Sequence, residues 1–355
     1  MKLTITLTLK GREPFTYRWM QYMNEMRCPY KILIADGGDD PVLEEHLRHS
    51  DSYPNLDYEY IRYPFDASLD DFYRKLENVI SRVRTEYILQ ADNDDFYLLD
   101  RIPEIIAFLD NNSDYVAARG QLVNFEVFNS SGSSKGQVQG AYYKAIPVEA
   151  PSLDGDCALQ RTENLCHDMS KYDYYSNWYS IVSTQVLQGI WRDLITLPIK
   201  EVIVLEILSH VMLVNKGKLK VFPYPFYLRQ ANTSVFGDTL VVGNEFLERC
   251  IVNNAFSEFV MAVEQFIKPA STGDRKRILS AIAGWLETFV VNIHRARQRR
   301  LSFTYRLAAL TRRVPVFGYW VEAAYISLAH LAFPARKGQR LRRIKEIEPF
   351  ALVSK

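Results

Sequence analysis

The stretch EYILQADNDDFYLLD, Glu86 to Asp100, places a group of acidic residues directly after an apolar run. Residues 87–91 are typical of a buried strand, and the run ends at Asp92-Asn93-Asp94-Asp95 before apolar residues resume. In parallel α/β sheets, ligands bind beyond the carboxyl ends of the strands, where loops carry polar groups. Clustered carboxylates repel one another unless a cation neutralises them. The pattern therefore predicts a divalent metal held by oxygen ligands at this strand end.

The spacing Asp-x-Asp is weak evidence by itself. It recurs at Asp154 and Asp156, in a segment without strand or helix pattern, and acidic residues are common in ordinary turns. The first occurrence differs because an amphipathic helix and a strand precede it. That helix begins at Ser68, where Ser68 and Asp71 have the spacing of a capping box. The sequence context therefore favours a site at Asp92–Asp95.

Strand-like and helix-like segments alternate over about the first 230 residues, which predicts an α/β fold with a mostly parallel sheet and flanking helices. The Gly- and Ser-rich residues 129–140 are expected to form an exposed loop. Strands are expected at 3–9, 30–38, 56–63, 86–91, 115–120 and 218–230, and helices at 15–26, 69–83, 102–111 and 201–214.

The composition changes after about residue 240, where the pattern becomes helical and basic. We expect a first domain at 1–238 and a helical, basic C-terminal domain at 239–355. Residues 271–355 hold 17 Lys and Arg against five Asp and Glu, a net charge of +12, although the chain carries only +1. Two interpretations of this charge stay open: binding to an anionic membrane surface, and packing against the acidic first domain. Nucleic-acid binding is not expected, because no recognition motif accompanies the charge.

No membrane-crossing segment is expected from the sequence. The N-terminal run is too short and too polar for a signal peptide, and the apolar residues 314–334 include Glu322 and His330. The four cysteines form no Cys-x-x-Cys pair, which excludes a zinc ribbon and a dithiol redox motif. A cytoplasmic protein, peripheral at the inner face of the membrane if the basic helices bind there, is the expectation.

Polar residues also follow the first two predicted strands. Asp36 ends the second, and the glycines after it allow a ligand to approach the backbone. An ordinary Asp-Gly-Gly turn explains the same residues equally well. Lys10 and Arg12 follow the first strand, where they line either a nucleotide pocket or a solvated loop.

The order LTITLTLKGRE, ILIADGG, helix and EYILQADNDDF resembles the nucleotide-sugar glycosyltransferases of the GT-A fold, in particular the family-2-like bacterial enzymes of polysaccharide assembly. The resemblance covers about residues 1–230 and lacks the glycines that usually precede the helix before Asp-x-Asp. It implies a nucleoside-diphosphate sugar, expected to be a UDP-sugar, a Mn²⁺ or Mg²⁺ ion, and a glycan or lipid-linked acceptor. By position, Asp36 would contact the base, Asp92 the ribose and Asp94 the metal, with Asp95 in support and Arg229 near the diphosphate.

Inverting relatives have an acidic pair at the start of a later helix, and this chain has only part of it. Glu201 and Glu206 are both candidates for the base that activates the acceptor, and the choice between them stays open. Asp173, in the tyrosine-rich segment 171–180, is a third candidate. Transfer with inversion is therefore expected from the resemblance alone.

Two other functions compete with glycosyl transfer. A sugar nucleotidyltransferase has a related topology, but the segment after the first strand has one glycine rather than a glycine-rich triphosphate loop. A non-catalytic binding protein that uses the basic helices is the second alternative. The incomplete acidic pair near Glu201 keeps it open, whereas Asp36, Asp92 and Asp94 argue against it.

Overall fold

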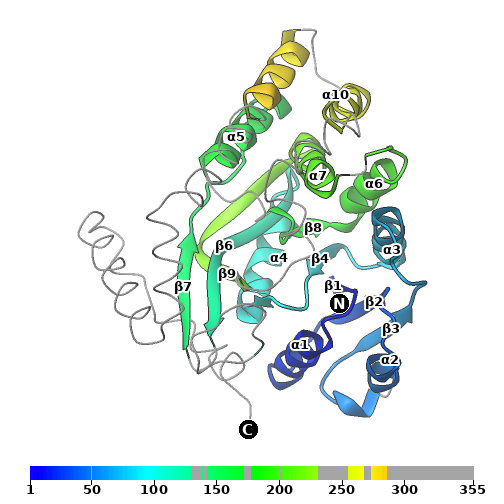
Figure 1. The fold of residues 1–355 in the computed structure, drawn as a ribbon. Helices are drawn as coiled ribbons and strands as arrows, with labels where there is room; N and C mark the ends of the chain where they lie inside the picture. The colour runs from blue at the N-terminus through cyan, green and yellow to red at the C-terminus, as the bar shows by residue number, and fades with distance from the viewer. Residues whose placement is uncertain are drawn as a thin grey trace, which may run out of the picture.

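The protein was analysed as a computed structural model, which describes residues 1–48, 50–128, 138, 142–171, 177–199, 201–230, 255–267 and 273–285 (Figure 1). The strands are β1 Leu3–Leu9, β2 Lys31–Asp36, β3 Tyr58–Arg62, β4 Tyr87–Ala91, β5 Phe96–Tyr97, β6 Tyr115–Phe128, β7 Tyr142–Val148, β8 Ile181–Ser183 and β9 Lys218–Gln230. The α-helices are α1 Glu13–Glu25, α2 Pro41–Arg48, α3 Leu69–Arg82, α4 Ile102–Asn111, α5 Ala158–Lys171, α6 Thr184–Leu194, α7 Val202–Lys216 and α10 Ala255–Phe266, and residues 273–285 are also helical. Short 3-10 helices lie at Ser50–Ser52 and Leu99–Arg101.

The strands form one nine-stranded sheet, in the order β3-β2-β1-β4-β8-β6-β9-β5, with β7 paired to β6. The pairs from β3 to β4 are parallel, and so is β6 with β9. The pairs of β4 with β8, β6 with β8, β6 with β7 and β5 with β9 are antiparallel. The α/β class is confirmed, and the sheet is parallel throughout its N-terminal half and mixed in the other.

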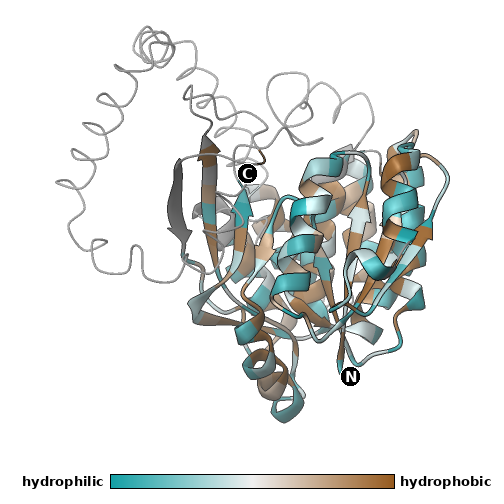
Figure 2. Cartoon of the chain, turned by 90° about the horizontal axis from the view of Figure 1, so that it is seen from below, coloured by the Kyte–Doolittle hydropathy of each residue, from teal (hydrophilic) through white to brown (hydrophobic). Residues whose placement is uncertain are grey.

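Helices cover both faces of the sheet, and each face has its own apolar core. Helices α1, α2 and α4 pack on one face, and α3, α5, α6, α7 and α10 pack on the other. Strand β1 shows how the sequence divides the two faces. Its Leu and Ile side chains enter the core beneath α1, and the threonines between them point to the other face, since successive side chains of a strand alternate. Figure 2 shows the resulting brown interior between helices with teal outer surfaces.

The helix before the acidic stretch begins as the sequence predicts. Ser68 caps α3, because its hydroxyl accepts a hydrogen bond from the Asp71 backbone N–H while the Asp71 carboxylate accepts one from the Ser68 N–H. Buried Leu76, Val79 and Ile80 of this helix pack on the sheet. The capped helix therefore fixes the direction in which the chain enters β4.

The register of the parallel strands brings their carboxyl ends to one edge. Leu9 at the end of β1 is opposite Asp36 of β2, and Leu7 is opposite Ala91 of β4. The next residues of each strand therefore leave the sheet side by side. Polar residues that lie far apart in the sequence meet at this edge for that reason.

A buried ion pair lies next to this edge of the sheet. The Lys75 ammonium of α3 contacts the Asp66 carboxylate and donates to the Leu9 carbonyl oxygen at 2.7 Å. Gly37 lies against the Asp66 side chain, and a Cβ atom at this position would come within 2.3 Å of Asp66 Oδ1. Burial raises the pKa of Asp66 and lowers that of Lys75, in each case against the attraction of its partner. The pair therefore fixes the geometry of the edge at a cost in desolvation.

The described residues after β9 pack on the same core as the rest. Phe259 and Val263 of α10, with Trp285 of the helix at 273–285, join the apolar core around α7. Arg277 pairs with Glu163 of α5 at 2.8 Å. This contact agrees with the packing interpretation for one basic residue, whereas the basic helices expected beyond 285 lie outside the described residues.

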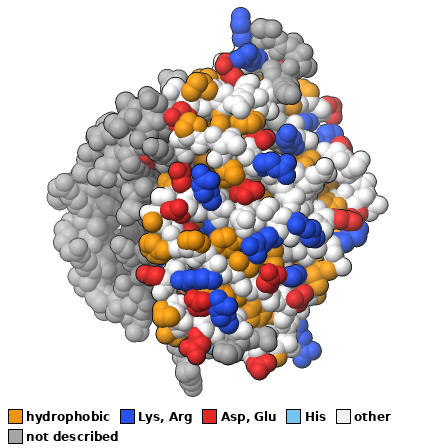
Figure 3. Space-filling view, turned by 90° about the vertical axis from the view of Figure 1, so that its right-hand side faces the viewer, with side chains coloured by type: hydrophobic (Ala, Val, Ile, Leu, Met, Phe, Trp, Pro, Cys, Tyr) orange, Lys and Arg blue, Asp and Glu red, His pale blue; other side chains and the backbone are white. Residues whose placement is uncertain are grey.

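The surface of the first 230 residues is mixed in charge where Figure 3 shows it. Side chains of both signs alternate with apolar ones over the face that includes α2 and α3. Among the helices that the structure describes, none combines the length and the apolarity that crossing a membrane requires.

Replacing Lys75 with alanine is expected to destabilise the fold by roughly 3–5 kcal/mol, because it leaves the Asp66 carboxylate buried without its partner. Urea unfolding of the variant and the wild type measures this difference. Lys31→Ala is the control, since it breaks an exposed ion pair with Glu59 and should cost at most about 1 kcal/mol. Equal losses in the two variants would contradict the role given to the buried pair.

Candidate functional site

Three carboxylates converge beyond the end of β4. Oxygen atoms of Asp92, Asp94 and Asp95 all lie within 4.8 Å of one another, and they form the only such group of potential metal ligands among the described residues. Asp94 and Asp95 are buried and Asp92 is half-buried. The strand end predicted from the sequence is therefore an acidic cluster, and the second Asp-x-Asp, at 154–156, is not.

Arg12 supplies the nearest positive charge to this cluster. It donates to Asp94 Oδ1 and to Asn93 Oδ1, both at 2.7 Å. Its backbone is left-handed, with φ of 64°, which is strained for a residue other than glycine, and Gly11 before it has φ of 67°. These two residues turn the chain between β1 and α1. Burial opposes the charge on Arg12, but Asp94, Asp92 and Asp95 offset it and raise its pKa.

Asp95 is the most enclosed of the three carboxylates. One of its oxygens accepts a hydrogen bond from the Tyr227 hydroxyl, and the other accepts one from the Gln230 backbone N–H at 2.8 Å. Burial, followed by the charges of Asp94 and Asp92, raises the pKa of Asp95 well above its ordinary value. Asp95 therefore fastens the cluster to β9.

Asp92 faces the second half of the sheet. Its carboxylate accepts a hydrogen bond from the Tyr179 hydroxyl at 2.6 Å, and the Tyr179 ring stacks on Tyr227 with centroids 3.9 Å apart. Burial and the nearby Asp94 raise the pKa of Asp92, whereas Tyr179, Arg12 and Arg229 act in the opposite direction. Arg229, at the end of β9, therefore lies within electrostatic reach of the cluster.

The donor set fits a hard divalent cation. Carboxylate oxygens are the ligands that Mg²⁺ and Mn²⁺ prefer, and three of them converge here. Both oxygens of Asp95 already accept hydrogen bonds from Tyr227 and Gln230, whereas Asp94 pairs with Arg12 and Asp92 accepts from Tyr179. Metal binding requires deprotonated ligands, and the raised pKa of Asp92 and Asp95 therefore makes the affinity pH-dependent. The cysteines and His167 near α5 form no comparable group among the described residues.

Asp36 lies buried at the end of β2, 1% exposed. Its Oδ1 accepts a hydrogen bond from the Gly38 N–H at 2.7 Å, and its Oδ2 accepts from the Tyr60 hydroxyl at 2.7 Å and from Arg62 at 3.0 Å. A carboxylate has about four acceptor positions, so three bonds leave about one for a ligand. Asp36 therefore orders its own neighbourhood as well as offering a single contact.

Lys10 lies beside the loop between β3 and α3. Its ammonium group donates to the Asp66 carbonyl oxygen at 2.5 Å and lies 5.2 Å from the centre of the Phe65 ring, which is half exposed. The structure thus brings Lys10, Arg12, Asp36 and the acidic cluster to one edge of the sheet, which is where the sequence predicts them.

The two acidic residues at the start of α7 differ in their surroundings. Glu201 is buried, 4% exposed, at the helix N-terminus, whereas Glu206 is half-buried. Burial, and then the charge of Asp92, raise the pKa of Glu206 to about 8, and Arg229 opposes the shift. Glu206 therefore belongs electrostatically to the cluster. Asp173 lies outside the described residues.

Sequence reasoning missed the residues that hold the cluster in place. Asn93 donates to the Thr16 hydroxyl oxygen at 2.9 Å, and the buried Arg18 donates to the Asp94 carbonyl oxygen at 3.0 Å. The sequence pattern identifies Tyr227 only as part of a predicted strand and Tyr179 only as part of an aromatic segment. The alternation of β9 puts Tyr227 on the same face as Arg229, which is the one signal in the sequence that pointed to it.

Asp95→Ala is expected to cost roughly 1–3 kcal/mol of unfolding free energy, because it leaves the Tyr227 hydroxyl and the Gln230 N–H without an acceptor.

Asp95→Asn keeps the shape and removes the charge. A carboxyl group with a raised folded-state pKa destabilises the fold as pH rises through that pKa, so this variant should gain stability relative to wild type as pH increases. Urea unfolding between pH 5 and 8 (roughly the range where most proteins are stable), in a metal chelator, measures both. If Asp95→Asn loses as much unfolding free energy as Asp95→Ala at every pH, the raised pKa assigned to Asp95 is contradicted.

No protein-family model and no curated protein matches the chain. Among solved structures it is similar to S. aureus TarS 1-349 in complex with UDP-GlcNAc, with 10% identity, 81% of this chain and 82% of that chain covered, and a TM-score of 0.44. It is also similar to the mannosyltransferase PcManGT from Pyrobaculum calidifontis in complex with GDP-Man and Mn²⁺, with 9% identity, coverage of 90% and 86%, and a TM-score of 0.43. A third is a CMP:2-keto-3-deoxy-manno-octonic acid synthetase complexed with CTP, with 12% identity, coverage of 73% and 99%, and a TM-score of 0.35. Proteins that bind nucleotide sugars are thus among the structures that this chain resembles.

Proposed function

We propose that this chain is a metal-dependent glycosyltransferase that moves a sugar from a nucleoside diphosphate to an acceptor hydroxyl. The observation that carries the proposal is the cluster of Asp92, Asp94 and Asp95 at the carboxyl edge of the sheet, with Arg12 paired to it and Arg229 within electrostatic reach. Carboxylates for a cation together with guanidinium groups for phosphate oxygens suit a diphosphate ligand. A site for a metal alone would not need the arginines.

Under this proposal, particular side chains bind each part of the donor. Asp92 and Asp94 would hold the cation, which when bound would neutralise charge on the departing diphosphate. Arg12 and Arg229 bind phosphate oxygens, and Asp95 supports the cluster from β9. Asp36 offers its remaining acceptor position to the nucleoside, and Lys10 holds the loop beside it.

Glu206 is the base in this proposal. Its carboxylate takes the proton of the acceptor hydroxyl, the acceptor oxygen forms a bond to the anomeric carbon, and the bond from that carbon to the diphosphate oxygen breaks. The nucleoside diphosphate leaves with the electron pair. Glu206 is preferred to Glu201 because it is half-buried and shares electrostatics with Asp92, whereas Glu201 is buried at the helix start.

Inversion at the anomeric carbon and a glycan or lipid-linked acceptor of surface polysaccharide assembly are further parts of the proposal. They rest on the sequence resemblance. Peripheral membrane association at the inner face of the membrane rests on the +12 charge of residues 271–355, and a catalytic domain at 1–238 rests on the change in composition.

Nucleoside diphosphates with Mn²⁺ or Mg²⁺ are expected to raise the thermal stability of the wild type. Binding to the folded state alone adds about 2.7 kcal/mol when the ligand is at a hundredfold excess over Kd. Asp94→Asn should remove this increase, and Asp154→Asn, in the second Asp-x-Asp, should keep it. A panel of five bases, each with and without metal, identifies the nucleotide. If Asp94→Asn responds like the wild type, the cluster is not the donor site.

The pH dependence of donor hydrolysis, in which water replaces the acceptor, tests the base. Glu206 must lose its proton to act, so kcat/KM should rise with pH along a limb whose midpoint is no higher than about 8, because a cation at Asp92 lowers the pKa of Glu206 further. Arg229→Gln should move this limb to higher pH, since Arg229 lowers the same pKa.

Glu206→Gln should reduce donor hydrolysis by about 10²–10⁴-fold, the usual contribution of a general base. Glu201→Gln in the same helix is the matched control and should keep the ascending limb. The reverse result would assign the base to Glu201. Release of pyrophosphate from a nucleoside triphosphate and a free sugar, in place of nucleoside diphosphate from the donor, would identify a nucleotidyltransferase.

A further inference from the structure

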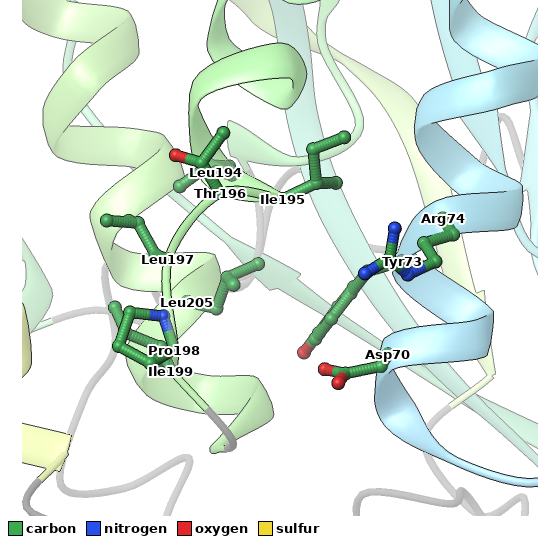
Figure 4. A pocket seen from close by; sticks show the side chains of 10 residues that line it. All are labelled: Asp70, Tyr73, Arg74, Leu194, Ile195, Thr196, Leu197, Pro198, Ile199 and Leu205. Carbon is green, nitrogen blue, oxygen red and sulfur yellow. The ribbon is translucent and has the colours of Figure 1, made fainter.

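A cavity of about 340 Å³ lies between the first turns of α3 and the connector that joins α6 to α7 (Figure 4). Its two walls differ in chemistry. Helix α3 contributes Asp70, Tyr73 and Arg74, whereas the connector and α7 contribute apolar side chains such as Leu197, Pro198 and Leu205. Ligand-binding cavities measure about 300–1,000 Å³, so the space suits one small ligand.

Among the side chains that line the cavity, the Tyr73 hydroxyl is a buried polar group for which the described residues supply no partner. Tyr73 is 5% exposed, and its hydroxyl has no hydrogen-bond partner. Figure 4 shows its ring extending from α3 toward the connector, with the hydroxyl beside the Asp70 side chain. Most buried polar groups in proteins are hydrogen-bonded, and leaving one unsatisfied costs free energy. A ligand hydroxyl in the cavity would satisfy it.

The cavity lies beside the helix that carries the proposed base. Leu205, which lines it, precedes Glu206 in α7. Burial, followed by the charges of Glu206, Glu201 and Asp70, raises the pKa of Tyr73 well above its ordinary value, so this phenol stays a hydrogen-bond donor. Glu206 in turn is sensitive to the charge of Asp92. Tyr73, Glu206 and Asp92 are therefore coupled electrostatically in that order.

The charges around Tyr73 also limit the ligand. The cavity lining carries one acidic and one basic side chain, Asp70 and Arg74, so it offers no excess of positive charge to an anionic ligand such as a phosphate. A neutral ring with hydroxyl groups on its edge and C–H groups on its face matches a polar wall opposite Leu197 and Pro198. Saccharides have this combination.

We infer that this cavity is an acceptor subsite that binds one neutral saccharide ring, with Tyr73 donating to a ring hydroxyl and Asp70 and Arg74 at its rim. Its role as the acceptor site rests on the proposed function, whereas the binding itself does not. Tyr73 is a binding residue in this assignment and takes no proton.

The test is saturation-transfer NMR with the methyl β-glycosides of glucose, galactose and N-acetylglucosamine. Uridine diphosphate and Mg²⁺ are present to fill the donor site. At least one glycoside should receive saturation from the wild type. Leu197→Trp, which fills the cavity from a half-buried position, should abolish the effect. Tyr73→Phe should weaken binding about three- to tenfold, the usual effect of one lost hydrogen bond.

Tyr87→Phe is the matched control. It removes a hydroxyl at the opposite end of the sheet, where Tyr87 donates to Asp110 at 3.0 Å, and should leave glycoside binding unchanged. Absence of binding by every glycoside, unaltered binding in Leu197→Trp, or a loss in Tyr73→Phe no larger than in Tyr87→Phe would each overturn the assignment. Thermal shift with nucleoside diphosphates is recorded on the same samples. If that shift is absent while glycosides bind to the cavity, the transferase proposal fails and the saccharide site stands.

Discussion

Repulsion among Asp92, Asp94 and Asp95 is the constraint on which the rest of the site depends. Three carboxylate groups within 4.8 Å of one another, two of them buried, raise the free energy of the fold unless positive charges and hydrogen-bond donors surround them. The structure provides these from the turn after β1 and from β9, which lie on opposite sides of β4, with β8 and β6 between β4 and β9. Arg12 comes from one and Tyr227 and Arg229 from the other. Burial, followed by residual repulsion from Asp94, raises the pKa of Asp92 and Asp95.

The surrounding fold keeps this arrangement rigid. The left-handed backbone at Arg12 persists because its guanidinium group is held between Asn93 and Asp94. Below the edge, Lys75 joins Asp66 to the Leu9 carbonyl oxygen, and thereby ties α3 to the end of β1. Backbone strain and a buried ion pair both cost free energy, and both lie where the strand ends have to be aligned. Helix packing on the two faces of the sheet offsets these costs.

The electrostatics extend from the cluster toward α7 and α3. The charge of Asp92 contributes to the raised pKa of Glu206, and the charge of Glu206 contributes to that of Tyr73. Electrostatic coupling therefore extends from the proposed donor site to the cavity beside α3. Arg229 opposes the charge at the Asp92 end. The acidic cluster with its arginines suits a diphosphate and a cation, whereas the cavity beside α3 suits a neutral polyol.

Local sequence patterns are enough to predict the α/β class, the capped helix at Ser68, the strand before Asp92 and the position of Asp36, Lys10 and Arg12 at strand ends. These features depend on neighbours a few residues apart, and periodicity and capping chemistry report such neighbours directly. The mixed order of the second half of the sheet, the support of Asp95 by Tyr227 and the difference between Glu201 and Glu206 required the tertiary structure. Tyr227 is 132 residues from Asp95, and the burial of Glu206 depends on helices and strands from the whole chain. A pKa or a cavity is set by atoms close in space, and local sequence patterns do not specify which distant segments supply them.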